Sequence, residues 1–437
     1  MTGTPRLDTV STKQVRIAEL AKIYRDTPLL TLAHHMDLDW MRQAYALTRK
    51  DGAVGIDGVT ADAYGVDLDA NLVALLDRMH SGTYRAPPVR RVHIPKGDGS
   101  QTRPIGIPTF EDKIAQRAIA MLLEPIYEEE FCPFSYGFRP GRSAHQALDA
   151  LMKGARELGG EWVLDVDVSK FFDTLDHKQL QELLRKRVGD GVVVRMVGKW
   201  LNAGVLEEGV VHHADRGTPQ GGVISPLLAN IYLHEVLDLW WVREVSPRLS
   251  GKAFLIRYAD DFVVVFADHA DALRVQEVLP KRFAKFGLTL HPTKTRLVPL
   301  RVNKEGSDEP PPGNFDFLGF THYGGRSRSG SPTIMRKTAS SRLSRSMKAL
   351  NEWMRRARHL PVAAQAETLA QKLRGHFGYY GIAGNSRAIN RFAYAARVLW
   401  RKWLRRRSQR TRLTWEAFNR LLVRYPLPPA RLRHQAT

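Results

Sequence analysis

The stretch at residues 256–265, IRYADDFVVV, places two adjacent acidic residues inside an apolar run. Both flanks are rich in β-branched and aromatic residues, which predicts two strands with Asp260 and Asp261 at the turn between them. Adjacent carboxylates repel, and partial burial raises the free energy of ionising them, so a divalent cation would stabilise the pair. The alternative for an isolated Asp-Asp dipeptide is a polar hairpin tip that faces water.

A second strand with acidic residues is WVLDVDVSKFF at residues 162–172. Because side chains alternate along a strand, Asp165 and Asp167 are expected on one face and the apolar residues on the other. A strand with an aspartate beside a hairpin with two is the arrangement that a two-metal site needs. Mg²⁺ prefers oxygen ligands, and two such ions serve in-line phosphoryl transfer.

Composition narrows the class of protein. The chain has 437 residues, 43% of them hydrophobic, which indicates a globular protein of two or three domains. Its one cysteine, Cys132, excludes a disulfide framework and a cysteine zinc module. The N-terminus lacks an apolar segment, and no run approaches the roughly 18 apolar residues of a membrane span. A cytoplasmic protein without a membrane partner is therefore expected.

The positive charge is concentrated at one end of the chain. Residues 331–437 hold 24 of the 66 Lys and Arg residues and 3 of the 45 Asp and Glu residues, so residues 1–330 hold 42 of each. The whole net charge of +21 therefore lies in the last quarter. This asymmetry favours a polyanion-binding module over a solubility tail, because the region also carries core-like aromatic residues such as Trp353 and Trp400.

The periodicity of apolar residues predicts a mixed fold of the α+β class. Helices are expected within 1–80, on both sides of the glycine-rich loop GAVGIDGVT. After Thr338 the pattern predicts helices and no strands. Two extended segments within 84–108 are joined by the turn KGDGS. Residues 302–314 are expected to form a loop. Further helices are predicted at 111–130, 176–188, 225–239 and 270–286, the third opened by Ser225 as N-cap and Pro226 in the first turn.

Seven blocks in order resemble one family. YADD at 258–261 resembles the Tyr-x-Asp-Asp box of reverse transcriptases, and DVSKFFDTLDH at 167–177 resembles their first catalytic strand. RGTPQGGVISPLLANIYLHEVLD at 216–238 is similar to the motif that separates group II intron reverse transcriptases from retroviral ones and from retrons. The other blocks are IPKGDGSQTRPIGIPTFEDKIAQ (94–116), SYGFRPGRSAHQAL (135–148), LTLHPTKTRLV (288–298) and FDFLGF (315–320).

The resemblance implies a right-hand polymerase. An N-terminal helical extension and fingers (1–83) would precede the fingers and palm (84–330), whose antiparallel sheet carries the YADD hairpin. An all-α thumb and maturase region (331–437) would follow. The loop GIDGVT at 55–60 resembles a block that lies near the template–primer in the family. KLRGHFGYYGIAGN (372–385), with the basic helix that follows it, resembles the thumb and maturase region that grips intron RNA. We expect the aromatic residues there to pack helices together, and Arg401, Arg405, Arg406 and Arg407 to contact RNA.

The same resemblance assigns the site residues. Asp167, Asp260 and Asp261 would bind two Mg²⁺ ions, with Asp165 a supporting or structural acid. Phe172 would close over the sugar and exclude a 2′-hydroxyl, whereas Phe171 is the better candidate for core packing. Residues near the incoming triphosphate or nucleotide would be Lys96, Arg103, Gln220, Gly221, Gly222 and, in the palm, Lys294. For Lys96 and Arg103 the alternative is a solvated basic turn.

The expected function is an RNA-directed DNA polymerase, a nucleotidyltransferase, that binds its group II intron RNA and assists splicing and mobility. Its partners would be an RNA template with a DNA or RNA primer, dNTPs and target DNA, and it would associate with the bacterial nucleoid during mobility. Without a cysteine cluster, a DNA-cleaving domain is not expected. The alternatives are a domesticated enzyme of DNA repair or phage defence, a splicing-only RNA-binding maturase, and an RNA polymerase, which Phe172 disfavours.

Overall fold

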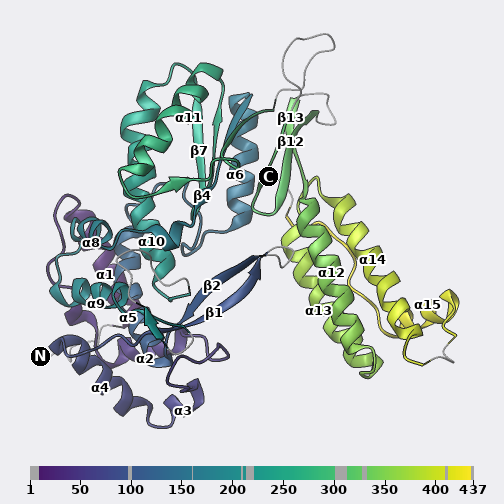
Figure 1. Ribbon diagram of the computed structural model, residues 1–437, viewed down its shortest axis with the longest axis horizontal. Helices are drawn as coiled ribbons and strands as arrows, with labels where there is room; N and C mark the ends of the chain where they lie inside the picture. Colours follow the sequence, from purple (N-terminus) through teal and green to yellow (C-terminus); the bar gives the residue numbers. More distant parts are fainter. Residues whose placement is uncertain are drawn as a thin grey trace, which may run out of the picture. The chain divides into compact units, whose positions relative to one another are not determined.

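The computed structural model describes residues 9–96, 101–159, 161–207, 210–212, 221–300, 313–326, 332–408 and 412–434 (Figure 1). The chain forms two compact units that do not follow chain order. Unit 1 contains residues 1–143, 164–264 and 270–296, and unit 2 contains residues 144–163, 265–269 and 297–437. No helix among the described residues is long and apolar enough to cross a membrane.

The N-terminal part of unit 1 is a helical cluster around one buried helix. Four helices, α1 (Val10–Ile23), α2 (Leu38–Leu47), α3 (Ala61–Gly65) and α4 (Leu68–Ser81), precede α5 (Phe110–Glu128), most of whose residues are buried. Helix α5 packs against α1 and α2. The glycine-rich loop lies against its start, since a Cβ on Gly55 would meet the Cα of Thr109 at 2.5 Å. The predicted helices of this region are confirmed.

A small sheet extends from this cluster. Strands β1 (Val89–Lys96) and β2 (Gln101–Ile107) pair antiparallel with Ile94 opposite Arg103, which confirms the two extended segments. Two short strands that the sequence did not predict, β5 (Val205–Glu207) and β6 (Val210–His212), complete the order β2-β1-β5-β6. Helices α8 (His177–Arg185) and α9 (Gly191–Leu201) pack against each other, and α9 also contacts α4.

The central sheet has the strand order β10-β3-β8-β7. The predicted hairpin is confirmed as β7 (Ala253–Tyr258) and β8 (Asp261–Phe266), and β10 is Arg296–Pro299. The first acidic strand is shorter than predicted: β3 (Trp162–Val166) ends just before Asp167. Strand β4 (Val168–Ser169) then pairs antiparallel with β9 (Thr289–Leu290), before the short helix α7 (Phe171–Thr174). The predicted helix after the hairpin is α11 (His269–Ala284).

The helix after the PQGG motif is irregular. Helix α10 (Ser225–Leu233) continues into two π-helical segments, η2 (His234–Asp238) and η3 (Trp241–Val245), and a 3₁₀ turn, η4 (Ser246–Arg248). The sequence placed the N-cap at Ser225, which is wrong by one residue. Ile224 is the N-cap and offers no side-chain oxygen, while Pro226 lies in the first turn as predicted. The backbone N–H of Ile224 instead donates to the Oε1 atom of Gln116, 3.3 Å away.

Unit 2 begins with helix α6 (Ala144–Leu158), which packs against the third strand of a sheet formed by β11 (Asn314–Phe317), β12 (Phe320–Arg326) and β13 (Pro332–Thr338). Helices α12 (Ser340–Ala357), α13 (Val362–Tyr380), α14 (Ser386–Arg405) and α15 (Trp415–Arg424) follow. Over the residues described after Thr338, the prediction of helices without strands is confirmed. Their shared core includes one apolar face of α12 and one of α14, with Leu343, Leu350, Met354, Ile389, Phe392 and Trp403 buried.

The C-terminal segment after α15 returns to the corner between α13 and α14. The backbone N–H of Arg433 donates to the carbonyl of Gly381 at 2.7 Å, and His434 forms a bridge with Ile382. The His434 ring stacks on His145 of α6, with 3.9 Å between ring centroids. Of the aromatic residues before the corner, Phe377 is 2% exposed in the core of the helices, as expected, whereas the Tyr379 ring lies 5.9 Å from the ring of Phe320 on β12.

Candidate active site and nucleic-acid interface

The turn of the YADD hairpin consists of Ala259 and Asp260, and Ala259 has a left-handed backbone with φ of 58°. This conformation is unfavourable for a residue with a Cβ, so the surroundings must enforce it. The segment 134–137 runs beside β7, where Tyr136 donates its N–H to the carbonyl of Arg257 at 2.9 Å. Gly137 then touches the turn itself, since a Cβ there would lie 2.3 Å from the amide nitrogen of Ala259. Only glycine allows this approach.

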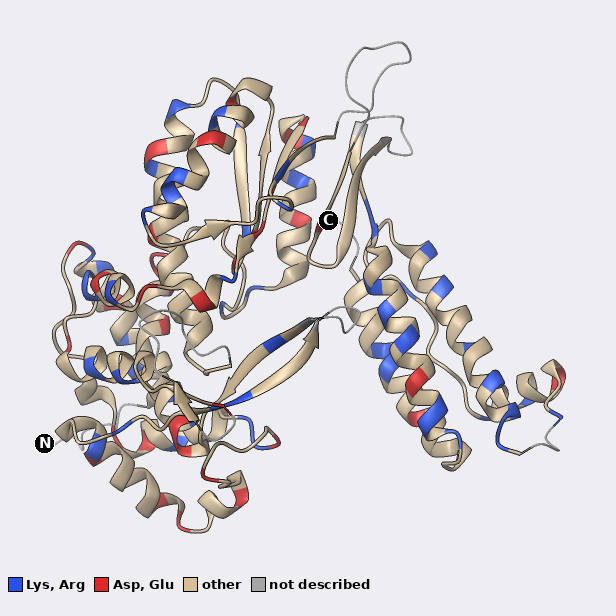
Figure 2. Cartoon of the chain, in the orientation of Figure 1, with Lys and Arg blue, Asp and Glu red and all other residues tan. Residues whose placement is uncertain are grey.

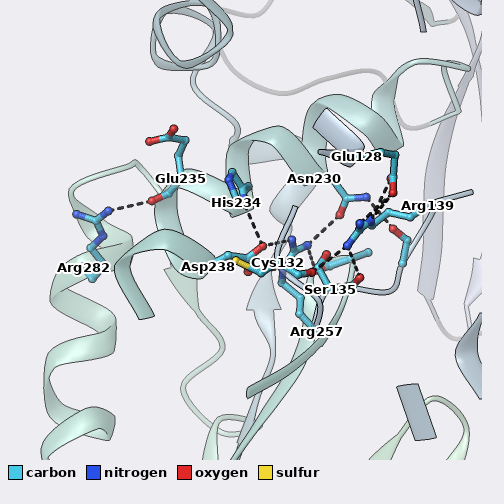
Figure 3. A network of polar contacts seen from close by, with 12 residues as sticks. Glu128, Cys132, Ser135, Arg139, Asn230, His234, Glu235, Asp238, Arg257 and Arg282 are labelled. Carbon is cyan, nitrogen blue, oxygen red and sulfur yellow. Dashed lines mark hydrogen bonds and ion pairs between the residues drawn. The ribbon is translucent and has the colours of Figure 1, made fainter. Parts of the chain in front are cut away.

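Behind the hairpin lies a buried ion pair that the sequence reasoning missed (Figure 3). Arg257 and Asp238 are both fully buried, and the Arg257 Nε donates to Asp238 Oδ1 at 2.8 Å. The Arg257 Nη1 donates to the Oδ1 of Asn230 at 2.9 Å and to the carbonyl of Ala259 at 3.2 Å. Asn230 in turn donates through Nδ2 to the carbonyl of Gly137 at 2.7 Å. One guanidinium therefore connects α10, η2 and the turn of the YADD hairpin.

The charge state of this pair follows from its contacts. Burial alone would raise the pKa of Asp238, but Arg257 and His234 hold that pKa below its ordinary value. The Nδ1 of His234 lies 3.6 Å from the Asp238 carboxylate. Asp238 is therefore a carboxylate at neutral pH, and it balances the charge of Arg257 inside the protein. Charged residues in apolar runs, such as Arg257 within FLIRY, are the sequence signal that could have revealed this network.

Asp167 follows β3 and is fixed through its backbone. Its carbonyl accepts hydrogen bonds from the N–H of His291 at 2.8 Å and from the Oγ1 of Thr295 at 3.4 Å. Its carboxylate, 42% exposed, pairs with the Nζ of Lys294 at 3.1 Å. The carboxylate of Asp165 lies 3.6 Å from the Nε of Arg296, and its role as a supporting or structural acid stays a prediction. The predicted residues Asp167 and Lys294 are thus in direct contact.

The electrostatics of Asp260 show which charges surround it. Burial raises the pKa of Asp260, and the neighbouring charge of Asp167 raises it further, whereas Arg103 and Arg257 act in the opposite direction. Asp167 lies between β3 and β4, and Arg103 lies on β2 of another sheet; both are predicted site residues. The structure therefore brings the segment after β3, the hairpin turn and β2 within electrostatic range of one another.

A divalent cation fits the chemistry of this site. Two carboxylates, Asp167 and Asp260, repel each other here, and a cation would remove that repulsion. Lys294 now supplies the positive charge beside Asp167. Among the residues that the structure describes, no group of three or more His, Cys, Asp or Glu is close enough to form a metal cluster. The participation of Asp261 as a third ligand therefore stays a prediction.

Some of the residues predicted to contact the incoming nucleotide lie outside the part of the chain that the structure describes. These are Gln220 and the side chain of Lys96. Phe171 is 2% exposed and belongs to the core, as expected, while Phe172 is only half-buried and contacts Phe171 edge-on with 5.3 Å between ring centroids. Gly221 has φ of 114°, and a Cβ there would meet the carbonyl of Gly106 at 2.5 Å. The close approach that requires this glycine is thus to β2.

The basic helices of unit 2 carry the candidate RNA interface. Figure 2 shows Lys and Arg spread over α12, α13 and α14 with few acidic residues among them. Arg405 and Arg406 are exposed as predicted. Arg401, by contrast, contacts other groups of the protein. Its Nη2 donates to the carbonyl of Leu413 at 3.0 Å, and its guanidinium lies 4.2 Å from the Trp415 ring centroid. Arg407 is turned toward the carbonyl of Leu360, 3.3 Å from its Nη2.

A second part of this interface was missed by sequence reasoning. Along α14, the exposed residues Arg387, Arg391, Tyr394 and Arg397 follow each other at intervals of three or four, so they share one face. Tyr394 is 68% exposed, which is unusual for an aromatic side chain in a packed bundle. The signal was present in the sequence, because the buried stripe of α14 leaves this opposite face free for charge.

Comparison with protein families identifies two regions. Residues 94–322 match the model of the reverse transcriptase (RNA-dependent DNA polymerase) family, and residues 343–421 match the group II intron maturase-specific domain. The first match includes every residue of the hairpin, the buried ion pair and Asp167. The second match covers α13, α14 and most of α12 and α15.

Three curated relatives show how far the similarity extends. The chain is 38% identical over 259 residues to Protein YkfC of Escherichia coli, covering 52% of this chain and 68% of that protein. It is 43% identical over 203 residues to the group II intron-encoded protein LtrA of Lactococcus lactis, covering 45% of this chain and 33% of LtrA. An uncharacterised 91 kDa protein in the cob intron of Schizosaccharomyces pombe is 27% identical over 363 residues, which cover 69% of this chain and 44% of that protein. The chain thus spans only about a third of LtrA.

Proposed function

The chain belongs to the reverse transcriptase family of RNA-dependent DNA polymerases and carries a group II intron maturase-specific domain, and from this membership we propose how its residues copy RNA and bind the intron. The polymerase extends a DNA or RNA primer on an RNA template with dNTPs. Unit 2 binds folded group II intron RNA and assists splicing, and the two activities together support insertion into target DNA.

In the proposed reaction, Asp167, Asp260 and Asp261 hold two Mg²⁺ ions. Bound there, the ions would activate the primer hydroxyl and stabilise the leaving oxygen. Arg103 and Lys294 contribute positive charge for the triphosphate, because both lie within reach of the carboxylates. Phe172 closes over the sugar of the incoming nucleotide.

One observation carries this proposal: Asp167 and Asp260 influence each other electrostatically at a turn held by a buried ion pair. Such an arrangement concentrates negative charge at a fixed place in the protein. A hairpin tip that merely faces water would need neither the buried arginine behind it nor the close contact of Gly137. Positioning of charge is the contribution that phosphoryl transfer demands of a protein.

The test separates polymerisation from splicing assistance. Asp260→Asn with Asp261→Asn removes the metal-binding charge but keeps the side-chain shape, so cDNA synthesis on an RNA template should fall by several orders of magnitude. Intron RNA binding and assisted splicing should survive, because they depend on phosphate contacts elsewhere. Asp77→Asn, an exposed substitution on α4, serves as the control for Asp→Asn changes in general.

Two outcomes would contradict the proposal. Persistent cDNA synthesis by the double variant would mean that the two acidic residues are only a polar hairpin tip. Loss of both activities in a variant whose melting temperature is unchanged would mean that catalysis and RNA binding are not divided between these regions.

A further inference from the structure

Phe138 combines an unfavourable backbone with an exposed ring. Its φ of 56° is in the left-handed region, and 58% of the residue is exposed to solvent. The left-handed backbone conformation is strained for a residue with a Cβ. Because the ring is exposed, its burial contributes little free energy to offset that strain. Glycine would be more stable at this position. Neither the local conformation nor packing therefore accounts for phenylalanine here.

The residues on both sides of Phe138 are fixed by contacts. The carbonyl of Gly137 accepts the Nδ2 of Asn230 at 2.7 Å. Arg139, 6% exposed, donates to the carboxylate of Glu128 at 2.9 Å and to the carbonyl of Ser135 at 2.7 Å (Figure 3). Because both neighbours are held, the strained backbone conformation of Phe138 is imposed, and its Cα–Cβ bond keeps one direction.

The ring is held beside the catalytic turn. Its centroid lies 6.2 Å from that of Tyr258, the last residue of β7 before Ala259 and Asp260. A cation is available on the same segment, since the exposed Arg142 lies over the Tyr136 ring at 5.5 Å. An exposed ring on a fixed backbone, with an arginine on the same segment, is suited to nucleotides, because the ring can stack on a base while the guanidinium pairs with a phosphate.

We propose that Phe138 stacks on a base of the template–primer bound at the YADD hairpin, and that Arg142 contacts a phosphate of the same strand. This inference rests on the proposed function. It explains why a strained, exposed aromatic residue is fixed at this place. The ring fits a base of either strand, and the experiment distinguishes the template from the primer.

The main experiment compares Phe138→Gly, Phe138→Ala and Phe138→Trp in the full chain. Phe138→Gly should raise the midpoint of urea unfolding, because glycine adopts positive φ without strain. The Kd for a labelled RNA template–DNA primer should rise about 5- to 150-fold for Gly and Ala, the range expected when one base no longer stacks on an aromatic ring. The Trp variant should bind as the wild type does. Val66→Ala, at a residue 78% exposed on the same unit, is the control for removing an exposed apolar side chain.

Abasic substitutions locate the base. A single abasic nucleotide is moved along the template and then along the primer. For the wild type, affinity should fall more at one position than at its neighbours, and for Phe138→Ala the abasic nucleotide at that position should cost no further affinity. The strand that contains this position is the strand that Phe138 contacts.

The proposal is overturned if Phe138→Gly is more stable and binds template–primer as tightly as the wild type. It is equally overturned if the Trp variant loses affinity as Ala does, since the ring would then not be stacking. Failure of the proposed function is a separate result: the wild type would bind template–primer without extending it, and the binding comparison would still decide the role of Phe138. A wild type that binds no template–primer would refute both.

Discussion

At the scale of single residues, the site depends on a few side chains whose burial or backbone conformation would be unfavourable alone. Arg257 is a fully buried cation, and it is tolerated because Asp238 and Asn230 satisfy its guanidinium. The desolvation of a buried ion pair offsets much of its attraction, so such a pair adds little net stability, but removing one partner leaves an uncompensated charge. Arg257 is best understood as a residue that positions the turn through the carbonyl of Ala259.

Arg257→Met should therefore be strongly destabilising. Leaving Asp238 buried without its partner should lower the free energy of unfolding by about 3–5 kcal/mol. Adding Asp238→Leu should recover a large part of this loss, because both buried charges are then gone. Urea unfolding of the single and double variants measures the difference. If the double variant is as unstable as the single one, the loss arises from packing and not from the unpaired carboxylate.

Phe172→Ala should weaken sugar discrimination. Removing the half-buried ring would make room for a 2′-hydroxyl, so ribonucleotide incorporation should rise relative to deoxynucleotide incorporation. The ratio of kcat/KM values for the two nucleotide types is the measurement. Phe171→Leu is the matched control, because Phe171 is buried and its truncation should lower stability without altering the ratio. An unchanged ratio in folded Phe172→Ala would reject the assignment.

At the scale of elements, the sequence predicted most helices and strands but not their irregularities. Periodicity placed the hairpin, because its apolar flanks bury on both faces. It could not show that β3 ends before Asp167, because the break is imposed by the distant segment 289–295. Nor could it reveal β5, a three-residue strand made by parallel pairing with β1. The buried Arg257 and the strained Phe138 were missed for the same reason: their contacts come from segments remote in sequence.

Helix α14 gives the most direct test at this scale. Changing Arg391, Arg397 and Arg405 to Gln should reduce the salt dependence of RNA binding, by about 0.7 in the slope of log K against log salt for each phosphate that the variant no longer neutralises. Arg401→Gln is the matched control on the same helix. Because Arg401 pairs with the carbonyl of Leu413 and lies over Trp415, this change should lower stability and leave the slope unchanged.

Filter binding at several salt concentrations measures how the RNA affinity of each variant depends on salt. An unchanged slope in the triple variant would place the phosphate contacts on another surface.

At the scale of the whole molecule, the compact units are interleaved along the chain. Residues 144–163 and 265–269 belong with the C-terminal helices in unit 2, although the sequence suggested functional divisions at 83 and 330. Those divisions remain a proposal about activity. The interleaving means that a fragment ending at residue 330 would lack the remaining partners of α6, which packs against β13 at Pro332–Thr338.

The buried histidine of unit 2 should make the protein sensitive to acid. Burial and the nearby Arg336 lower the pKa of His322 to about 3. The unfolded chain has a histidine pKa near 6.5 and binds the proton first, so stability is lost as pH falls from about 6.5 toward 3. At pH 5 this residue alone should lower the free energy of unfolding by about 2 kcal/mol relative to pH 7.5.

His322→Leu should reduce the loss of stability between the two pH values by about 2 kcal/mol, and the part that remains includes His376, whose pKa burial lowers to about 4. The exposed His80→Asn should leave the loss unchanged. The measurement is the difference in the free energy of unfolding between pH 7.5 and pH 5.0 for each variant. Any change in packing caused by the leucine is the same at both pH values and therefore cancels. A pH difference in His322→Leu as large as that of the wild type would assign the acid sensitivity to groups other than His322.

The contact between Gly137 and the turn at Ala259 also constrains how this protein can be recombined with its relatives. The two segments fit without a gap, and Asn230 joins them by a hydrogen bond to the same glycine. A chimera whose crossover falls between residues 139 and 230 would take the two sides of this contact from different parents. Crossovers that keep residues 134–139, 230 and 257–260 from one parent should give folded, active hybrids more often than those that divide them.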